Sequence, residues 1–238
     1  MRSACTRVAA VVALLVLSSL ILPSRAAAGE ERDPALQAVI EKFDAAQARI
    51  QRISATFREV KHIALLKEPV VQSGEFFHTK PDKFLWEYTK PEPKKLLLNG
   101  KNIVAYYPLE KRAEEIKTRF TKRIIEYLGL GSVLSELEDE YSMSFGEPND
   151  LPGTDLIELT PKQRRIAKRL SKIRIWLDHK LSQPRQIEYI EADGDSSKIT
   201  FSQININPEI ELTKYEIKIP DDFKVTNSIS GLFAASSQ

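Results

Sequence analysis

The chain has 238 residues, with 35 Lys and Arg against 33 Asp and Glu, which gives a formal net charge of +2. This length predicts one large domain or two small ones, and it is sufficient to bury a core without disulfides or metals. A single Cys excludes an intrachain disulfide framework and any metal site built on several cysteines. The small net charge gives no support for a nucleic-acid partner.

Residues 1–28 have the pattern of a cleaved secretory signal peptide. An apolar stretch follows Arg2 and Arg7 and ends at Pro23, and the alanines at 26–28 suit a signal peptidase. The stretch is short for a spanning helix, which needs about 20 apolar residues, so an uncleaved anchor is the weaker alternative. Cleavage also removes the Cys and leaves 32 basic and 33 acidic residues, a formal charge of −1, in a chain exported to the periplasm.

The first predicted element of the mature chain is a helix over residues 34–53. Apolar side chains recur at i, i+4 and i+7 from Leu36 to Ile50, as on one face of an amphipathic helix. Asp33 supplies an N-cap, and the Pro that follows it suits the first helical position.

From residue 55 to residue 107 the pattern changes to consecutive short strands. Phe84, Trp86 and Tyr88 alternate with polar or smaller residues, and Asn99-Gly100 is a strong hairpin signal. The links are too short for crossover helices, so we expect an antiparallel sheet. The predicted strands of this region are 55–66, 74–79, 84–88, 95–98 and 103–107.

Residues 118–137 return to helical spacing and predict two short helices separated by Gly129 and Gly131. The later predicted strands are 141–145, 156–160, 173–177, 186–190, 198–206 and 212–219. The whole pattern predicts one domain over residues 29–227, with about ten antiparallel strands and three helices, followed by a small polar tail at 228–238.

The segment Lys162–Arg174 contains seven basic residues and no acid. Because it joins two predicted strands, we expect a long basic hairpin. Such a hairpin is either simply solvated or a docking surface for anionic headgroups or an acidic partner.

Motifs for catalysis are not found in the sequence. There is no glycine-rich phosphate loop and no nucleophile elbow, and His62, His78 and His179 are isolated from one another. The 33 carboxylates offer too many pairs to identify a hydrolytic pair among them. The sequence therefore predicts a protein that is not an enzyme and that uses no cofactor or metal.

Several segments, taken in order, resemble the periplasmic outer-membrane lipoprotein carrier family, LolA. The family has a strand that ends in a basic residue and Pro, then F-x-W, a Pro turn, a hairpin with Asn or Asp before Gly, and a Y-x-P-like end. The resemblance covers roughly residues 36–225, and the matching segments are 55–57, 74–91, 99–100, 106–108, 159–161, 173–178, 184–187 and 199–225.

This resemblance implies a mainly β (α+β) fold, in which a single-domain incomplete antiparallel barrel carries a helical lid over an apolar cavity. Members accept acylated lipoproteins from an inner-membrane ABC transporter complex, shield the acyl chains, and deliver them to an outer-membrane lipoprotein receptor. Shielding is physically necessary, since each CH₂ moved out of water is worth about 0.8 kcal/mol. We expect the carrier to act as a monomer.

Alternation and apolarity identify candidate cavity residues, for which ordinary core packing is the alternative. The candidates are Phe43, Phe57, Phe76, Phe84, Trp86, Tyr88, Ile124, Leu128 and Leu134. The resemblance also implies a latch: the family often has Arg before the Pro that matches Pro81, linked to holding the lid through backbone carbonyls. Here the residue is Lys80, which can donate to a carbonyl but lacks the planar fork of Arg.

Other functions remain alternatives to the lipoprotein carrier. One is a carrier of another exported lipid or of a glycolipid. A second is a lipoprotein-sensing regulatory module with the same half-barrel, although such modules usually have a second domain. An envelope hydrolase is the enzyme alternative, and no motif supports it.

Overall fold

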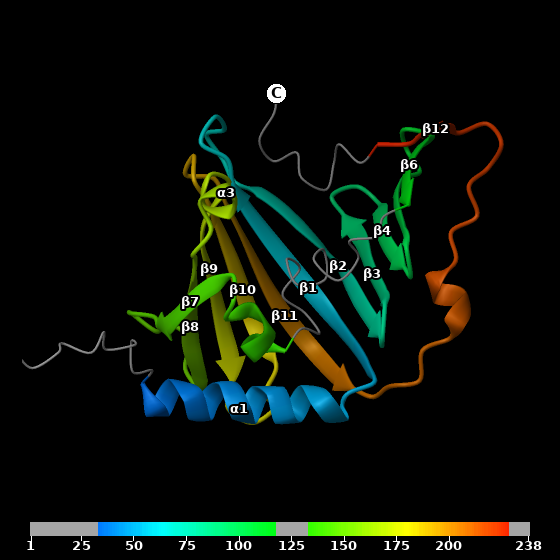
Figure 1. The fold of residues 1–238 in the computed structure, drawn as a ribbon. Helices are drawn as coiled ribbons and strands as arrows, with labels where there is room; N and C mark the ends of the chain where they lie inside the picture. Colours follow the sequence, from blue (N-terminus) through cyan, green and yellow to red (C-terminus); the bar gives the residue numbers. More distant parts are fainter. Residues whose placement is uncertain (1–32, 118–132, 229–238) are drawn as a thin grey trace, which may run out of the picture. The chain divides into compact units, whose positions relative to one another are not determined.

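The computed structural model describes residues 33–117 and 133–228, which belong to one compact unit that begins at Asp33. Within these ranges twelve strands form a single sheet, in the spatial order β12-β6-β5-β4-β3-β2-β1-β11-β10-β9-β8-β7 (Figure 1). The strands are β1 (Arg52–His62), β2 (Val70–Thr79), β3 (Lys83–Lys90), β4 (Lys94–Asn99), β5 (Asn102–Tyr107), β6 (Arg112–Lys117), β7 (Tyr141–Phe145), β8 (Thr154–Pro161), β9 (Leu170–Asp178), β10 (Pro184–Glu191), β11 (Ser196–Ile206) and β12 (Lys224–Thr226). Because β7 and β12 are edges that do not pair with each other, the sheet stays open, which confirms the predicted mainly β, incomplete barrel.

Helix α1 (Pro34–Arg49) begins as predicted, and the Asp33 carboxylate caps its first turn. The predicted end at residue 53 is wrong, because the helix ends at Arg49. The reason lies in the sheet: Ile53 already belongs to β1, where it pairs with His78 of β2 and Ile206 of β11. Pairing on both sides overrides the helical spacing of these residues.

The prediction of a wholly antiparallel sheet is wrong at one edge, where β12 runs parallel to β6. Neither strand is predicted from the sequence. Four of the six residues of β6 are Arg, Glu or Lys, a composition that is poor in the side chains that favour strands. The pairing of β12 depends on a return of the chain from the far end of β11, which short-range pattern does not reveal.

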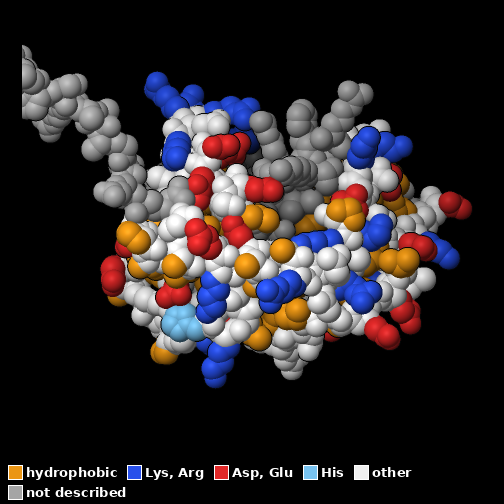
Figure 2. Space-filling model, turned by 60° about the horizontal axis from the view of Figure 1, so that its bottom comes forward, with side chains coloured by type: hydrophobic (Ala, Val, Ile, Leu, Met, Phe, Trp, Pro, Cys, Tyr) orange, Lys and Arg blue, Asp and Glu red, His pale blue; other side chains and the backbone are white. Residues whose placement is uncertain are grey.

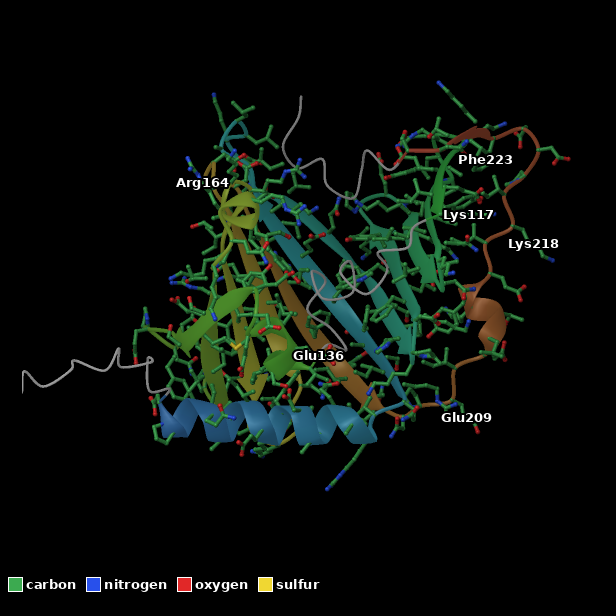
Figure 3. All side chains as sticks on the ribbon, in the orientation of Figure 1. Lys117, Glu136, Arg164, Glu209, Lys218 and Phe223 are labelled. Carbon is green, nitrogen blue, oxygen red and sulfur yellow. The ribbon has the colours of Figure 1, made fainter. Side chains whose placement is uncertain are left out.

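The predicted strand at 212–219 is also wrong. The structure has a 3-10 turn there, η2 (Leu212–Tyr215), and the chain beyond it crosses the sheet instead of joining it. Tyr215 is buried against Leu85 and Leu97, and its hydroxyl lies 2.8 Å from that of Thr79. The alternation therefore reflects packing of one side of an irregular segment onto a sheet face. Figure 3 marks this path between Glu209 and Lys218.

The basic connection between β8 and β9 is a hairpin whose loop holds one helical turn, α3 (Arg164–Ala167). The turn was not predicted, because four residues are too few to show helical spacing. Two predicted short helices fall on 118–137, of which 118–132 lie outside the described residues. The described part forms a 3-10 turn, η1 (Leu134–Leu137).

The two faces of the sheet have different partners. We call the face that α1 covers the inner face and the opposite one the outer face. The main cluster of buried hydrophobic residues joins α1 to inner-face side chains from β1 to β11. A smaller cluster on the outer face lies under the segment that contains η2. Figure 2 views the end that α1 occupies, where basic, acidic and hydrophobic side chains are interspersed.

The outer face of the other half of the sheet carries ion pairs between strands. Glu158 of β8 accepts hydrogen bonds from Lys172 Nζ at 2.5 Å and Arg174 Nε at 2.7 Å, both on β9. Glu188 of β10 lies 3.7 Å from Arg174 and 3.4 Å from Lys198 of β11. Burial alone would raise the pKa of Glu158, but the hydrogen bonds from Lys172 and Arg174 outweigh this effect and lower the pKa.

Gly74 is required by the close approach of β2 and β3. A Cβ placed on it would lie 2.0 Å from the Glu87 carbonyl oxygen, which is backbone and cannot move aside without breaking the strand pairing. We expect Gly74→Ala to lower the free energy of unfolding by about 3 kcal/mol, measured by urea denaturation.

The matched control is Gly153→Ala, where a Cβ would meet nothing within 4 Å and only the positive φ of 77° opposes it. That change should cost about 1 kcal/mol. Equal losses in the two variants would contradict the steric explanation for Gly74.

Candidate functional site

Aromatic side chains from four adjacent strands meet on the inner face. Phe57 of β1 lies opposite Phe201 of β11, and Phe76 of β2 lies opposite Trp86 of β3. The ring centroids of Phe57 and Trp86 are 4.8 Å apart, as are those of Phe76 and Trp86. Phe201 completes the group at 5.9 Å from Trp86. These separations are typical of favourable edge-on and tilted aromatic pairs.

The sheet places a glycine between two of these rings. Phe57, Gly74 and Tyr88 are consecutive partners across β1, β2 and β3. Since Gly74 has no side chain, the rings of Phe57 and Tyr88 meet above it with their centroids 5.0 Å apart. The aromatic surface therefore continues across three strands without interruption.

Helix α1 and turn η1 cover this surface from the side opposite the sheet. Leu36, Ile40 and Phe43 of α1 are buried in the same cluster, as is Leu134 of η1. The Asp44 carboxylate links the two elements, because it accepts the backbone N–H of Leu134 at 2.8 Å. The turn is thus held against the helix by a hydrogen bond at its own N-terminus.

Most of the predicted cavity residues come together in this cluster, although burial alone does not distinguish a cavity from a core. Tyr88 is half-buried at its margin, and Ile124 and Leu128 lie outside the described residues. Sequence reasoning missed Phe201, which its alternation within 198–206 could have identified, and His78. The predicted residues that are fully buried together are Phe43, Phe57, Phe76, Phe84, Trp86 and Leu134.

Polar groups end the apolar surface at the end of β1 farther from α1. The buried Glu59 carboxylate accepts hydrogen bonds from the Ser197 hydroxyl at 2.7 Å and the Tyr88 hydroxyl at 3.2 Å. Burial, and then the charge of Glu59, raises the pKa of Tyr88 well above its usual range. Lys94 Nζ lies 4.2 Å from the centre of the Tyr88 ring. The aromatic surface is therefore bordered at this end by polar groups that bind one another.

Helix α1 and turn η1 together form the cover of the aromatic surface. Lys80 contacts this cover at the C-terminal end of α1. Its Nζ donates a hydrogen bond to the backbone carbonyl oxygen of Gln47, in the last turn of α1, at 2.6 Å. The Gln47 carbonyl oxygen also accepts the backbone N–H of Ile50 at 3.2 Å, and a cation at this end of a helix is stabilised by the helix dipole. Whether this contact keeps a lid closed stays a prediction.

His78 is the one histidine of the three that is buried. Its ring stacks on Phe84 at a centroid distance of 4.0 Å, on the inner face. Burial, helped by the charge of Lys80, lowers the pKa of His78 to about 4. The imidazole is therefore neutral at pH 7. His62 is exposed, and His179 lies 3.1 Å from Asp155.

The described residues include no group of three or more His, Cys, Asp and Glu side chains that could hold a metal ion. No helix in the described ranges has the length and apolar character needed to cross a membrane.

Comparison with known proteins identifies similar sequences. Residues 48–218 match the family described as outer membrane lipoprotein carrier protein LolA. An outer-membrane lipoprotein carrier protein of Cupriavidus taiwanensis is 26% identical over 214 residues, covering 87% of this chain and 92% of the relative. Another, from Alkalilimnicola ehrlichii, is 22% identical over 165 residues, covering 67% and 70%.

Among solved structures, an uncharacterized conserved protein from Thermus thermophilus has a similar fold, with a TM-score of 0.54. It is 9% identical, and the match covers 82% of this chain and 99% of that one. At this identity the likeness concerns the fold alone.

The buried His78 makes stability sensitive to acid. Above pH 6.5 the imidazole is neutral in both states and contributes nothing, whereas between pH 6.5 and about 4 the unfolded chain binds a proton that the folded chain does not. The free energy of unfolding therefore decreases as the pH is lowered from 6.5 to about 4, by about 3 kcal/mol from this group alone. His78→Phe should remove that part of the loss in urea unfolding at pH 7.5 and pH 4.5. The control His62→Gln should retain it, and an unchanged loss in His78→Phe would contradict the assignment.

Because Lys80 contacts α1 only at its end, removing this contact should affect the local stability of α1 more than the stability of the whole fold. Lys80→Met should lower the free energy of unfolding by about 1 kcal/mol. It should also speed hydrogen exchange of amides at the C-terminal end of α1. In the control Lys83→Met, the lost hydrogen bond goes to Asn99 Oδ1 at 2.8 Å, away from α1. Equal exchange in α1 for the two variants would contradict a role of Lys80 in holding the helix.

Proposed function

The chain belongs to the outer membrane lipoprotein carrier protein LolA family, and from this premise we propose that it binds the acyl chains of lipoproteins on its inner face and carries them through the periplasm to the outer membrane. The observation that carries the proposal is the continuous aromatic surface beneath α1 and η1. In this role the inner-membrane ABC transporter complex loads the protein, and an outer-membrane lipoprotein receptor unloads it. We further propose that residues 1–28 are the export signal and that the carrier acts as a monomer.

The chemistry of an acyl chain fits this surface. An acyl chain offers only CH₂ groups, so it needs apolar walls rather than hydrogen-bonding groups along its length. Each CH₂ kept from water contributes about 0.8 kcal/mol, so a chain of about sixteen carbons is worth on the order of 10 kcal/mol. Rings of Phe and Trp present large flat apolar areas that such a chain can contact in many positions.

Binding requires the cover to separate from the sheet, because the aromatic rings are buried beneath it. The half-buried side chains that border the cluster are the first that an entering chain would contact. Ile116 of β6 and Leu96 of β4 are two of these, and both lie on the inner face beside the better-buried Leu98 and Ile103. An acyl chain would therefore enter over the half of the sheet formed by β4, β5, β6 and β12.

A transfer assay with matched variants tests the proposal. Purified protein is added to spheroplasts, and the released lipoprotein is measured together with lipid that copurifies with the protein, identified by mass spectrometry. We expect release by the wild type and a several-fold loss in Ile116→Asn, because a polar side chain on the acyl-binding surface is costly to desolvate. The control is Val104→Asn, a half-buried β-branched residue on the neighbouring strand that faces the outer cluster.

The outcomes separate the alternatives. Equal release by the two variants would contradict the inner face as the binding surface. Copurified glycolipid or another lipid without lipoprotein release would favour a carrier of that lipid. Absence of both release and bound acyl chains would overturn the carrier function, and hydrolysis of a lipid ester would favour an envelope hydrolase.

A further inference from the structure

Two polar side chains on the inner face have buried nitrogen atoms without hydrogen-bond partners. They are the indole Nε1 of Trp86 and both ring nitrogens of His78, and no described residue lies within hydrogen-bond reach of them. His78 is 1% exposed and Trp86 is 3% exposed. Buried polar atoms are nearly always paired in folded proteins, and an unpaired one opposes folding, so each exception requires an explanation.

Several other buried polar groups among the described residues are paired. The second tryptophan, Trp176, is 2% exposed, and its Nε1 donates to Asp150 Oδ1 at 3.1 Å. Glu59, on the inner face itself, has the hydroxyls of Tyr88 and Ser197 as partners. Gln47 Oε1 and Arg52 Nε also lack partners in the described part of the chain, but among the side chains of the aromatic surface the unpaired nitrogens are those of Trp86 and His78.

The strand register places the two side chains on the same face of two paired strands. Phe84 of β3 lies opposite His78 of β2, and Trp86 lies opposite Phe76, so His78 and Trp86 are diagonal neighbours on one face. Apolar rings surround them: His78 stacks on Phe84, and Trp86 contacts Phe76 and Phe57. His78 and Trp86 thus both present nitrogen atoms to an otherwise apolar surface.

Both donors are neutral. The indole does not ionise, and His78 is uncharged at pH 7 because its pKa is near 4, so it presents one N–H and one bare nitrogen. A neutral donor in apolar surroundings suits a neutral acceptor, since a phosphate or carboxylate would have to be desolvated without a compensating charge. A neutral acceptor that accompanies acyl chains is the ester carbonyl oxygen.

We propose that Trp86 Nε1 and a ring nitrogen of His78 form a binding site for the ester carbonyl groups of a diacylglycerol-type ligand. The inference rests on the proposed function and names the part of the cargo that this surface recognises beyond its hydrocarbon. In the bound state the carbonyls satisfy donors that the closed protein leaves unpaired. A ligand without carbonyls leaves those donors unpaired and binds less tightly.

Two lipids that differ only in these carbonyls test the site. 1,2-Dioleoylglycerol, a diester, and 1,2-di-O-oleylglycerol, the matching diether, are titrated against the purified protein by displacement of a fluorescent fatty acid. We expect the wild type to bind the diester about three- to tenfold more tightly than the diether. In His78→Phe and in Trp86→Phe this ratio should fall toward one. Trp176→Phe, the same substitution at the paired indole, should leave the ratio unchanged.

A spectroscopic measurement on the wild type avoids reliance on variants of the site itself. The chain has two tryptophans, so the indole N–H resonance that remains in Trp176→Phe belongs to Trp86. This resonance should move downfield when the diester binds and not when the diether binds. Where a Phe variant fails to fold, His78→Leu and this resonance carry the test. Equal affinities for the two lipids, or the same resonance position with both, would overturn the ester site and leave the carrier function standing. Binding of neither lipid would overturn both proposals.

Discussion

The apolar inner face of an open sheet is the constraint on which the rest of the structure depends. A closed barrel covers its own interior, but here β7 and β12 remain edges, so other elements must keep water from the aromatic surface. α1 and η1 do this within the described residues, and Asp44 joins them to each other. Where these rings meet, Gly74 lets β2 and β3 approach closely.

The outer face stabilises the sheet without a second layer of helices. One half has the segment around Tyr215 packed across it, and Phe223, labelled in Figure 3, stacks on Tyr106 with ring centroids 5.2 Å apart. The other half has the ion pairs of Glu158 and Glu188, which link β8 to β11.

The sequence predicted the local features and missed those that depend on distant parts of the chain. The Asp33 cap and the alternation of Phe84 and Trp86 are short-range signals, and the structure has the expected elements there. Ile53 and Tyr215 were misassigned because their neighbours in the fold, not in the sequence, decide their conformation. The hydrophobic members of the candidate site were identified as candidates from the sequence, whereas His78 was missed because an isolated His gives no sequence signal.

The free energy that holds α1 on the sheet is similar in size to the free energy of burying one acyl chain. Lys42 Nζ donates to the His179 carbonyl oxygen at 2.8 Å and Lys80 Nζ to that of Gln47 at 2.6 Å, and such hydrogen bonds each contribute about 1 kcal/mol. Burial of Leu36, Ile40 and Phe43 adds about 2 kcal/mol per side chain. The sum is on the order of 10 kcal/mol, comparable with the burial of one acyl chain of about sixteen carbons. In the proposed function, an acyl chain therefore replaces the cover at little net cost, and the proposed ester contacts to His78 and Trp86 shift that balance further toward the bound state.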